Sequence, residues 1–238
     1  MGITTILQMS ENYYLKSLDE IASLPKGDRP TLLFHVCCGP CACFPLLFLA
    51  PHFDITICYD NSNIYPESEF LRRREELRKL LAYYKRDYGF EIKLIMPPYD
   101  HDAYMKDLRP LAHEKEGGTR CRLCYKKRME EAYDFAEAHG FDYFCTVMSI
   151  SRQKDSLTMN EIGKELEKSH AHTKYFYSDF KKANGQLFGV KLRDHYRLYN
   201  QLYCGCEYSL LEGKERLAKE GKDPESILSN CQKSEAKK

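Results

Sequence analysis

Short apolar runs alternate with longer, charged segments along most of this chain. Apolar-rich runs of the length of buried strands cover residues 31–37, 53–59, 91–96, 143–148 and 174–177. The segments between them carry apolar positions at helical spacing and predict helices over 41–49, 67–84, from about 100, over 120–139 and over 155–169. Strands that alternate with helices pair in parallel, so the order predicts an α/β fold built on a doubly wound parallel sheet.

The organisation along the chain predicts a single α/β domain over residues 1–238. Residues 1–28 are expected to form a helical lead-in, and residues 209–238 a helical, polar tail. The C-terminal third, from residue 180 on, is polar and predicted to be helical. No internal repeat or low-complexity linker divides the sequence.

Composition limits the partners and the compartment. The chain has 36 basic and 35 acidic residues, so nucleic-acid binding would need a local basic patch rather than an overall charge. The first residues lack the pattern of a signal peptide, and no run reaches the roughly 18 apolar residues of a membrane span. A cytoplasmic protein without membrane contact is expected. Disulfides are rare in that compartment, so the eleven cysteines need another explanation.

Six of the cysteines come in three close pairs, of which the first ends a predicted strand and the second begins a predicted helix. The pairs are Cys37-Cys38, Cys121-x-x-Cys124 and Cys204-Gly-Cys206. Cys41 lies near the start of the helix that follows the first pair, where the helix dipole favours a thiolate. The carboxyl ends of parallel strands meet at one edge of a sheet, so the pairs are expected to converge there on a soft metal.

Residue spacing alone leaves several kinds of site open. A zinc site needs four ligands, and a thioredoxin-like redox pair needs two thiols. Six or seven thiols exceed both needs and suit a cubane iron–sulfur cluster with a second metal. Cys58 and Cys145 lie inside buried strands and are predicted to be core residues, whereas Cys43 and Cys231 receive no role.

Five segments together resemble the epoxyqueuosine reductases of the QueH type, the family that does not use cobalamin. The resemblance covers residues 31–210 and rests on HVCCGPC (35–41), TRCRLCYKKRM (119–129), SISRQKD (149–155), SDFKKANG (178–185) and YNQLYCGCEYSL (199–210). It implies a sheet of the adenine-nucleotide-alpha-hydrolase-like (HUP) type, with the paired cysteines in the place of a phosphate-binding loop.

The resemblance also implies the activity and the cofactors. Such an enzyme reduces epoxyqueuosine to queuosine at the wobble position of tRNA anticodons, with a [4Fe–4S] cluster and an additional mononuclear iron. By motif position the cluster ligands are Cys38, Cys121, Cys124 and Cys206. The implied ligands of the mononuclear iron are Cys37 and Cys204. Cys41 stands where some relatives have Asp, and is the candidate third ligand of that iron.

The implied partners are the anticodon loop of tRNA and an external electron donor such as a ferredoxin or flavodoxin. Arg152 and Lys154 follow the fourth strand and are predicted to contact tRNA phosphates. Further candidates for phosphate contacts are Arg120, Arg122, Lys126, Lys127 and Arg128. For Lys126 to Arg128, a solvated helix face is an equally good explanation. The run Arg72–Arg74 is predicted to lie on the surface.

The proton donor and the alternative functions remain open at this point. Asp60, Asp155 and Tyr59 follow strands at the active edge and are candidate donors, although each also suits an ordinary loop or cap. One competing function is a zinc- or cluster-stapled protein that binds or modifies tRNA without reducing an epoxide. Another is a nucleotide-binding enzyme of the same fold, which the absence of a Gly/Ser-rich phosphate loop disfavours.

Overall fold

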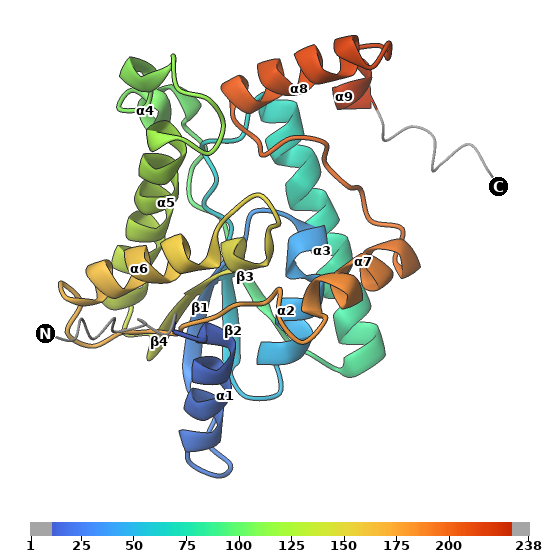
Figure 1. Cartoon of the computed structure of the whole chain (residues 1–238). Coiled ribbons are helices and arrows are strands. Elements are labelled where there is room, and N and C mark those ends of the chain that lie inside the picture. Colours follow the sequence, from blue (N-terminus) through green and yellow to red (C-terminus); the bar gives the residue numbers. More distant parts are fainter. Residues whose placement is uncertain (1–10, 230–238) are drawn as a thin grey trace, which may run out of the picture.

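Five parallel strands form one sheet at the centre of the molecule (Figure 1), in a computed structural model that describes residues 11–229. The strand order is β3-β2-β1-β4-β5, which reverses direction between β1 and β4. The bounds are β1 Thr31–His35, β2 Asp54–Cys58, β3 Lys93–Ile95, β4 Tyr143–Thr146 and β5 Lys174–Tyr175. The predicted doubly wound parallel sheet is confirmed.

The central strand β1 is buried on both faces. Leu32, Leu33 and Phe34 are all 0% exposed. Leu32 and Phe34 belong to the larger hydrophobic cluster, whereas Leu33 points the other way into a second cluster. This alternation explains why β1 reads as a continuous apolar run, because helices cover both faces of a parallel sheet.

Helices flank the sheet as two layers (Figure 1). One layer holds α2 (Gly39–Leu49), α3 (Glu67–Tyr88) and α7 (Gly185–His195), and the other holds α5 (Thr119–Ala138) and α6 (Ser156–Glu167). The remaining helices are α1 (Tyr13–Ser23), α4 (His101–Met105), η1 (Arg109–Leu111), η2 (Val147–Ile150), α8 (Glu207–Lys219) and α9 (Ser226–Ser229). Helices α7 to α9 form the predicted helical C-terminal region. The division into one domain with a lead-in and a tail stays a prediction.

The two edge strands are shorter than predicted. β3 has three residues instead of the six expected over 91–96, and β5 has two instead of four. Each edge strand pairs with only one neighbour, β3 with β2 and β5 with β4. Within residues 11–229, no helix is long and apolar enough to cross a membrane.

The turn from β1 into α2 brings the first cysteine pair to the carboxyl edge of the sheet. β1 ends at His35, and Cys38 occupies the N-cap position of α2. A Cβ atom on Gly39 would lie 2.9 Å from the carbonyl oxygen of Glu76 in α3. Only glycine therefore permits this close approach of α2 to α3. Pro40 follows in the first turn, where its missing N–H leaves no helical bond unmade.

Candidate metal centre

Three thiols gather where β1 passes into α2. The Sγ atoms of Cys37, Cys38 and Cys41 all lie within 4.8 Å of one another. Hydrogen bonds from Cys38 and then Cys41 lower the pKa of Cys37 well below its usual value. Burial, followed by the bond to Cys37, raises the pKa of Cys38, and the bond to Cys37 raises that of Cys41. Within the triad, deprotonation is therefore favoured at Cys37 over Cys38 and Cys41.

A second group of four cysteines lines one small pocket next to the triad's edge of the sheet. Cys121 and Cys124 come from the start of α5, and Cys204 and Cys206 from the loop that leads into α8. The Cys121 sulfur accepts a hydrogen bond from the Gly117 N–H (3.3 Å), and that of Cys206 from the Ser209 N–H (3.4 Å). Burial nevertheless outweighs these bonds: it raises the pKa of Cys121 above its usual value and that of Cys206 to about 11.

The structure thus brings all seven candidate ligands to one region, in groups of three and four. The motif-based assignment differs from these spatial groups. It assigns Cys38 to the cluster together with cysteines of the pocket, and it assigns Cys204 to the mononuclear iron together with cysteines of the triad. Lys154 and Arg128 connect the two groups electrostatically, since each acts on both Cys37 and Cys204. Which cysteine serves which metal stays a prediction.

Lys154 lies inside this region rather than on the surface. It is 8% exposed, and its Nζ atom lies 5.6 Å from the centre of the Tyr125 ring. Burial alone would lower the pKa of Lys154, but Cys204 and Cys37 raise it above its usual value. The ammonium group is therefore retained beside the thiols. This position does not support the predicted contact with a tRNA phosphate, whereas Arg152 is exposed as that role requires.

Arg73 is also buried, and the prediction that all of Arg72–Arg74 lies on the surface is wrong for it. The side chain is 1% exposed and bonds to Glu69 (2.8 Å). Its other two nitrogens donate to the carbonyl oxygens of Cys204 (2.8 Å) and Tyr203 (3.2 Å). Arg73 therefore fixes the backbone of the second cysteine loop, a role that a run of charges in the sequence does not reveal.

Two more predicted surface cations are buried. Arg120 and Arg128 are each 2% exposed. Arg120 donates to the carbonyl oxygens of Leu111 (3.2 Å) and Ala112 (3.1 Å), so it holds the loop that precedes α5. Both residues lie on the inner face of α5, and neither the solvated face nor the phosphate contact expected of them is supported.

The glycine between Cys204 and Cys206 is required by its surroundings. Gly205 has φ +146°, a backbone conformation that other residues rarely adopt. A Cβ atom there would lie 3.2 Å from both Arg73 Nη1 and Ile64 Cγ1. The spacing of this pair therefore reflects both the turn and the close approach of Arg73.

Of the remaining cysteines, the two predicted core residues lie where expected. Cys58 and Cys145 are 0% exposed inside β2 and β4, which confirms them as core residues. Cys43 is buried and bonds to the Gly39 carbonyl, and Cys231 lies outside the described residues. All ten described cysteines are free thiols.

Two of the three candidate proton donors already have structural roles. Asp155 caps α6 by accepting bonds from the N–H groups of Leu157 and Thr158. The Tyr59 hydroxyl is buried and donates to the Phe70 carbonyl oxygen (2.8 Å). Asp60 lacks such a cap role, and burial raises the pKa of its carboxyl group. Asp60 is the candidate that remains.

Sequence reasoning missed Gln201. Its Nε2 atom donates to the sulfur of Cys38 (3.0 Å) and approaches that of Cys41 (3.8 Å). Its Oε1 atom is buried and has no hydrogen-bond partner among the described residues. Gln201 lies three residues before Cys204, but only the fold reveals that it contacts the first cysteine triad.

The donor set fits soft metals. All candidate ligands are sulfur atoms, and the buried Lys154, Arg128 and Arg73 balance the negative charge that several thiolates would carry. The nearby His35 is not available as a ligand, since its two ring nitrogens pair with Thr146 Oγ1 (3.0 Å) and the Asp60 carbonyl (3.2 Å). A thiolate-only site with internal counter-charges suits iron–sulfur chemistry.

Comparison with known proteins adds an independent line of support. The family model described as epoxyqueuosine reductase QueH matches residues 32–212. The epoxyqueuosine reductase QueH of Streptococcus pyogenes serotype M1 is 38% identical over 181 residues, which cover 76% of this chain and 71% of that protein. The protein of that name from Staphylococcus aureus is 36% identical and covers 77% of each chain. The one from Thermotoga maritima is 33% identical and covers 79% of this chain and 94% of its own.

One solved structure also aligns along most of the chain. It is described as a predicted subunit of tRNA methyltransferase from Methanocaldococcus jannaschii. The alignment covers 83% of this chain and 92% of that one, with 16% identity and a TM-score of 0.39. A likeness of this size is too distant to indicate a shared function.

Proposed function

Because this chain belongs to the epoxyqueuosine reductase QueH family, we propose that it is an oxidoreductase that reduces epoxyqueuosine to queuosine at the wobble position of tRNA anticodons. The observation that carries the proposal is the gathering of seven thiols, with buried cations between them, at the carboxyl edge of the sheet. The alternative, a zinc-stapled tRNA-binding protein, needs only four of these ligands.

The chemistry of the reaction defines what the metals would supply. Turning the epoxide of a cyclopentane ring into an alkene takes two electrons and two protons and releases the oxygen as water. The proposal assigns these electrons to an external donor such as a ferredoxin or flavodoxin, and it includes a [4Fe–4S] cluster and a mononuclear iron. When bound, these groups supply single electrons and a Lewis acid for the epoxide oxygen.

The chain's own residues then have distinct tasks. Lys154 and Arg128 hold positive charge beside the thiolates, which stabilises the charged ligands away from water. Arg73 fixes the loop that carries Cys204, and Gln201 fixes the sulfur of Cys38. Asp60, at the carboxyl end of β2, is the proposed source of a proton.

The assignment of ligands has two versions that use the same thiols. By motif position, Cys38, Cys121, Cys124 and Cys206 hold the cluster, and Cys37 and Cys204 hold the iron, with Cys41 as third ligand. The spatial grouping instead favours the four pocket cysteines for the cluster and the triad for the iron. Only Cys38 and Cys204 change roles between the two versions.

The first test is to purify the protein without oxygen and to quantify iron, acid-labile sulfide and zinc. We expect a brown protein with about four to five irons per chain, which reduces epoxyqueuosine in tRNA when given a chemical reductant. A colourless protein with stoichiometric zinc and no reduction would establish the zinc-stapled alternative.

The second test compares Cys38→Ser with Cys204→Ser. If the motif assignment holds, Cys38→Ser loses most of the iron and the cluster absorbance, whereas Cys204→Ser loses about one iron in five. If the spatial grouping holds, the two results are exchanged. Cys145→Ser, in the core of β4, is the matched control and should retain iron.

A further inference from the structure

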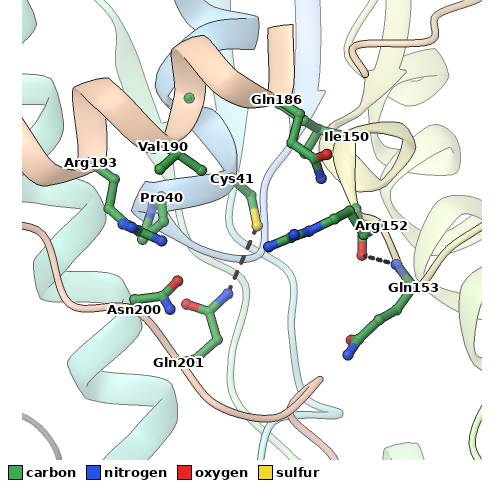
Figure 2. Close-up of a pocket in the computed structure, with 12 residues that line it drawn as sticks. Pro40, Cys41, Ile150, Arg152, Gln153, Gln186, Val190, Arg193, Asn200 and Gln201 are labelled. Carbon is green, nitrogen blue, oxygen red and sulfur yellow. Dashed lines mark hydrogen bonds between the residues drawn. The ribbon is translucent and has the colours of Figure 1, made fainter. Parts of the chain in front are cut away.

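A cavity of about 340 Å³ opens directly beside the cysteine triad. Four separate segments line it: the start of α2 with Cys41, the loop that follows η2, one face of α7, and residues 200–201 (Figure 2). Its volume is in the range of pockets that hold a small organic ligand. The cavity therefore connects solvent with Cys41, the member of the triad that lines it.

Carboxamide groups dominate the polar part of the cavity wall. Gln153, Gln186, Asn200 and Gln201 all line it, and each can donate and accept hydrogen bonds. Gln201 is the link to the metal centre, since it contacts both the cavity and the Cys38 sulfur. Its buried Oε1 atom has no donor among the described residues.

The charged part of the wall is entirely positive. Arg152 points its guanidinium group into the cavity toward Cys41, and Arg193 approaches from α7 (Figure 2). Arg193 also pairs with the exposed Asp194 beside it (2.7 Å), but no Asp or Glu lines the cavity. Ile150 and Val190 add aliphatic surface. This combination suits a flat, polar, uncharged ring that is attached to phosphates.

We infer that this cavity receives the modified, guanine-like base after it is extruded from the RNA loop, with Gln186 and Asn200 reading its hydrogen-bonding edge. The inference rests on the proposed function and adds the residues that select the base. A guanine-type edge presents adjacent N–H donors and a carbonyl acceptor, and carboxamides complement both. Arg152 and Arg193 contact the phosphates that flank the extruded nucleotide.

The test measures binding of two RNA probes by the iron-loaded protein, without reductant so that no turnover occurs. One probe is an anticodon stem–loop with epoxyqueuosine at the wobble position, and the other is the same RNA with an abasic wobble position. We expect the wild-type protein to prefer the first probe about tenfold or more. In the Gln186→Met/Asn200→Leu double variant, the ratio of the two affinities should fall about tenfold, because two hydrogen bonds to the base are lost. The iron content should not change.

A charge-matched pair on α7 separates base reading from phosphate contacts. Arg193→Met should weaken binding of both probes by the same factor and leave the preference unchanged. Lys191→Met is the control: Lys191 is exposed, lies two residues away and does not line the cavity. It should change either affinity by less than about twofold.

The outcomes distinguish this inference from the proposed function. If the double variant keeps the wild-type preference and its iron, the cavity does not read the base, even though the wild-type enzyme reduces epoxyqueuosine. If the wild-type protein neither binds the probes nor reduces the epoxide, the proposed function and this inference fall together. If the double variant loses iron, the single Gln186→Met variant is tested instead, because Gln186 does not contact the cysteine sulfurs. The ratio of its affinities for the two probes then shows whether the cavity reads the base.

Discussion

Replacing Arg73 by methionine tests whether a buried cation holds the second cysteine loop in place. Methionine keeps much of the side-chain volume but removes the charge and every donor. Three interactions are lost: the ion pair with Glu69 at 2.8 Å and the bonds to the carbonyl oxygens of Cys204 and Tyr203. Because Arg73 is 1% exposed, water cannot replace them without opening the structure.

The expected magnitude follows from these contacts. Removing one partner of a buried ion pair costs about 3–5 kcal/mol, mainly because the other charge stays buried. Glu69 keeps Arg72 at 3.6 Å and the Tyr199 hydroxyl at 3.1 Å, so the lower end of that range applies. A loss of about 3 kcal/mol corresponds to a melting temperature lower by about 6–12 °C for a protein of this size. The freed loop should also release iron.

The assay combines thermal unfolding with iron quantification on anaerobically purified protein. Arg74→Met is the matched control, since Arg74 is partly exposed and, among residues 11–229, pairs with the exposed Glu75 alone. It should change stability by less than about 1 kcal/mol and leave the iron in place. Arg73→Lys should fall between the two, because lysine restores the charge but not the three-way geometry. Equal melting temperatures and equal iron in Arg73→Met and Arg74→Met would refute the reasoning.

Three other predictions use the same protein. Lys154→Met should lower iron content but leave the salt dependence of tRNA binding unchanged, whereas Arg152→Ala should retain iron and reduce the salt slope by about one. Cys58→Ala should retain iron and activity at a modest loss of stability, and a loss of iron would show that Cys58 is a ligand. Burial raises the pKa of Glu131 to about 7, so stability present at pH 4 should fall as the pH rises to 7. Glu131→Gln should therefore stabilise the protein by about 1 kcal/mol at pH 8, a value reduced because the side chain is only half-buried. At pH 4 it should have no effect on stability, and an equal increase in stability at both pH values would contradict the prediction.

The sheet could be predicted from the sequence because its central strands are buried on both faces. In β1, Leu32 to His35 are all buried, and the apolar run Leu32–Phe34 is visible in the sequence alone. The edge strand β3 has one neighbour and partly exposed residues, so its pattern is mixed and the predicted range 91–96 is longer than the strand itself. Edge strands depend on tertiary contacts that periodicity does not encode.

The cysteines of the site could be predicted because pairs at close spacing are rare among core residues. Their grouping could not, since Cys38 and Cys204 lie 166 positions apart and only the turn geometry of α2 and of the Gly205 loop decides which sulfurs meet. Nothing in the sequence around Gln201 indicates a role at the metal centre. A carboxamide three residues before a cysteine is ordinary in a loop, and its contact with Cys38 exists only because the loop folds back over α2.

The burial of Arg73, Arg128 and Lys154 is not predicted from the sequence, and the nearby cysteines explain why. Moving a lone ammonium or guanidinium group out of water costs several kcal/mol, so a charge run is expected to lie on the surface. Thiolates offset that cost, because each one provides a negative charge inside the protein. Arg128 follows Cys124 by four residues on α5 and therefore shares its helix face, and Lys154 follows the strand that ends beside the triad. In a chain with three cysteine pairs, the cations at these positions are expected to turn inward, and the neutral overall charge conceals this local pairing.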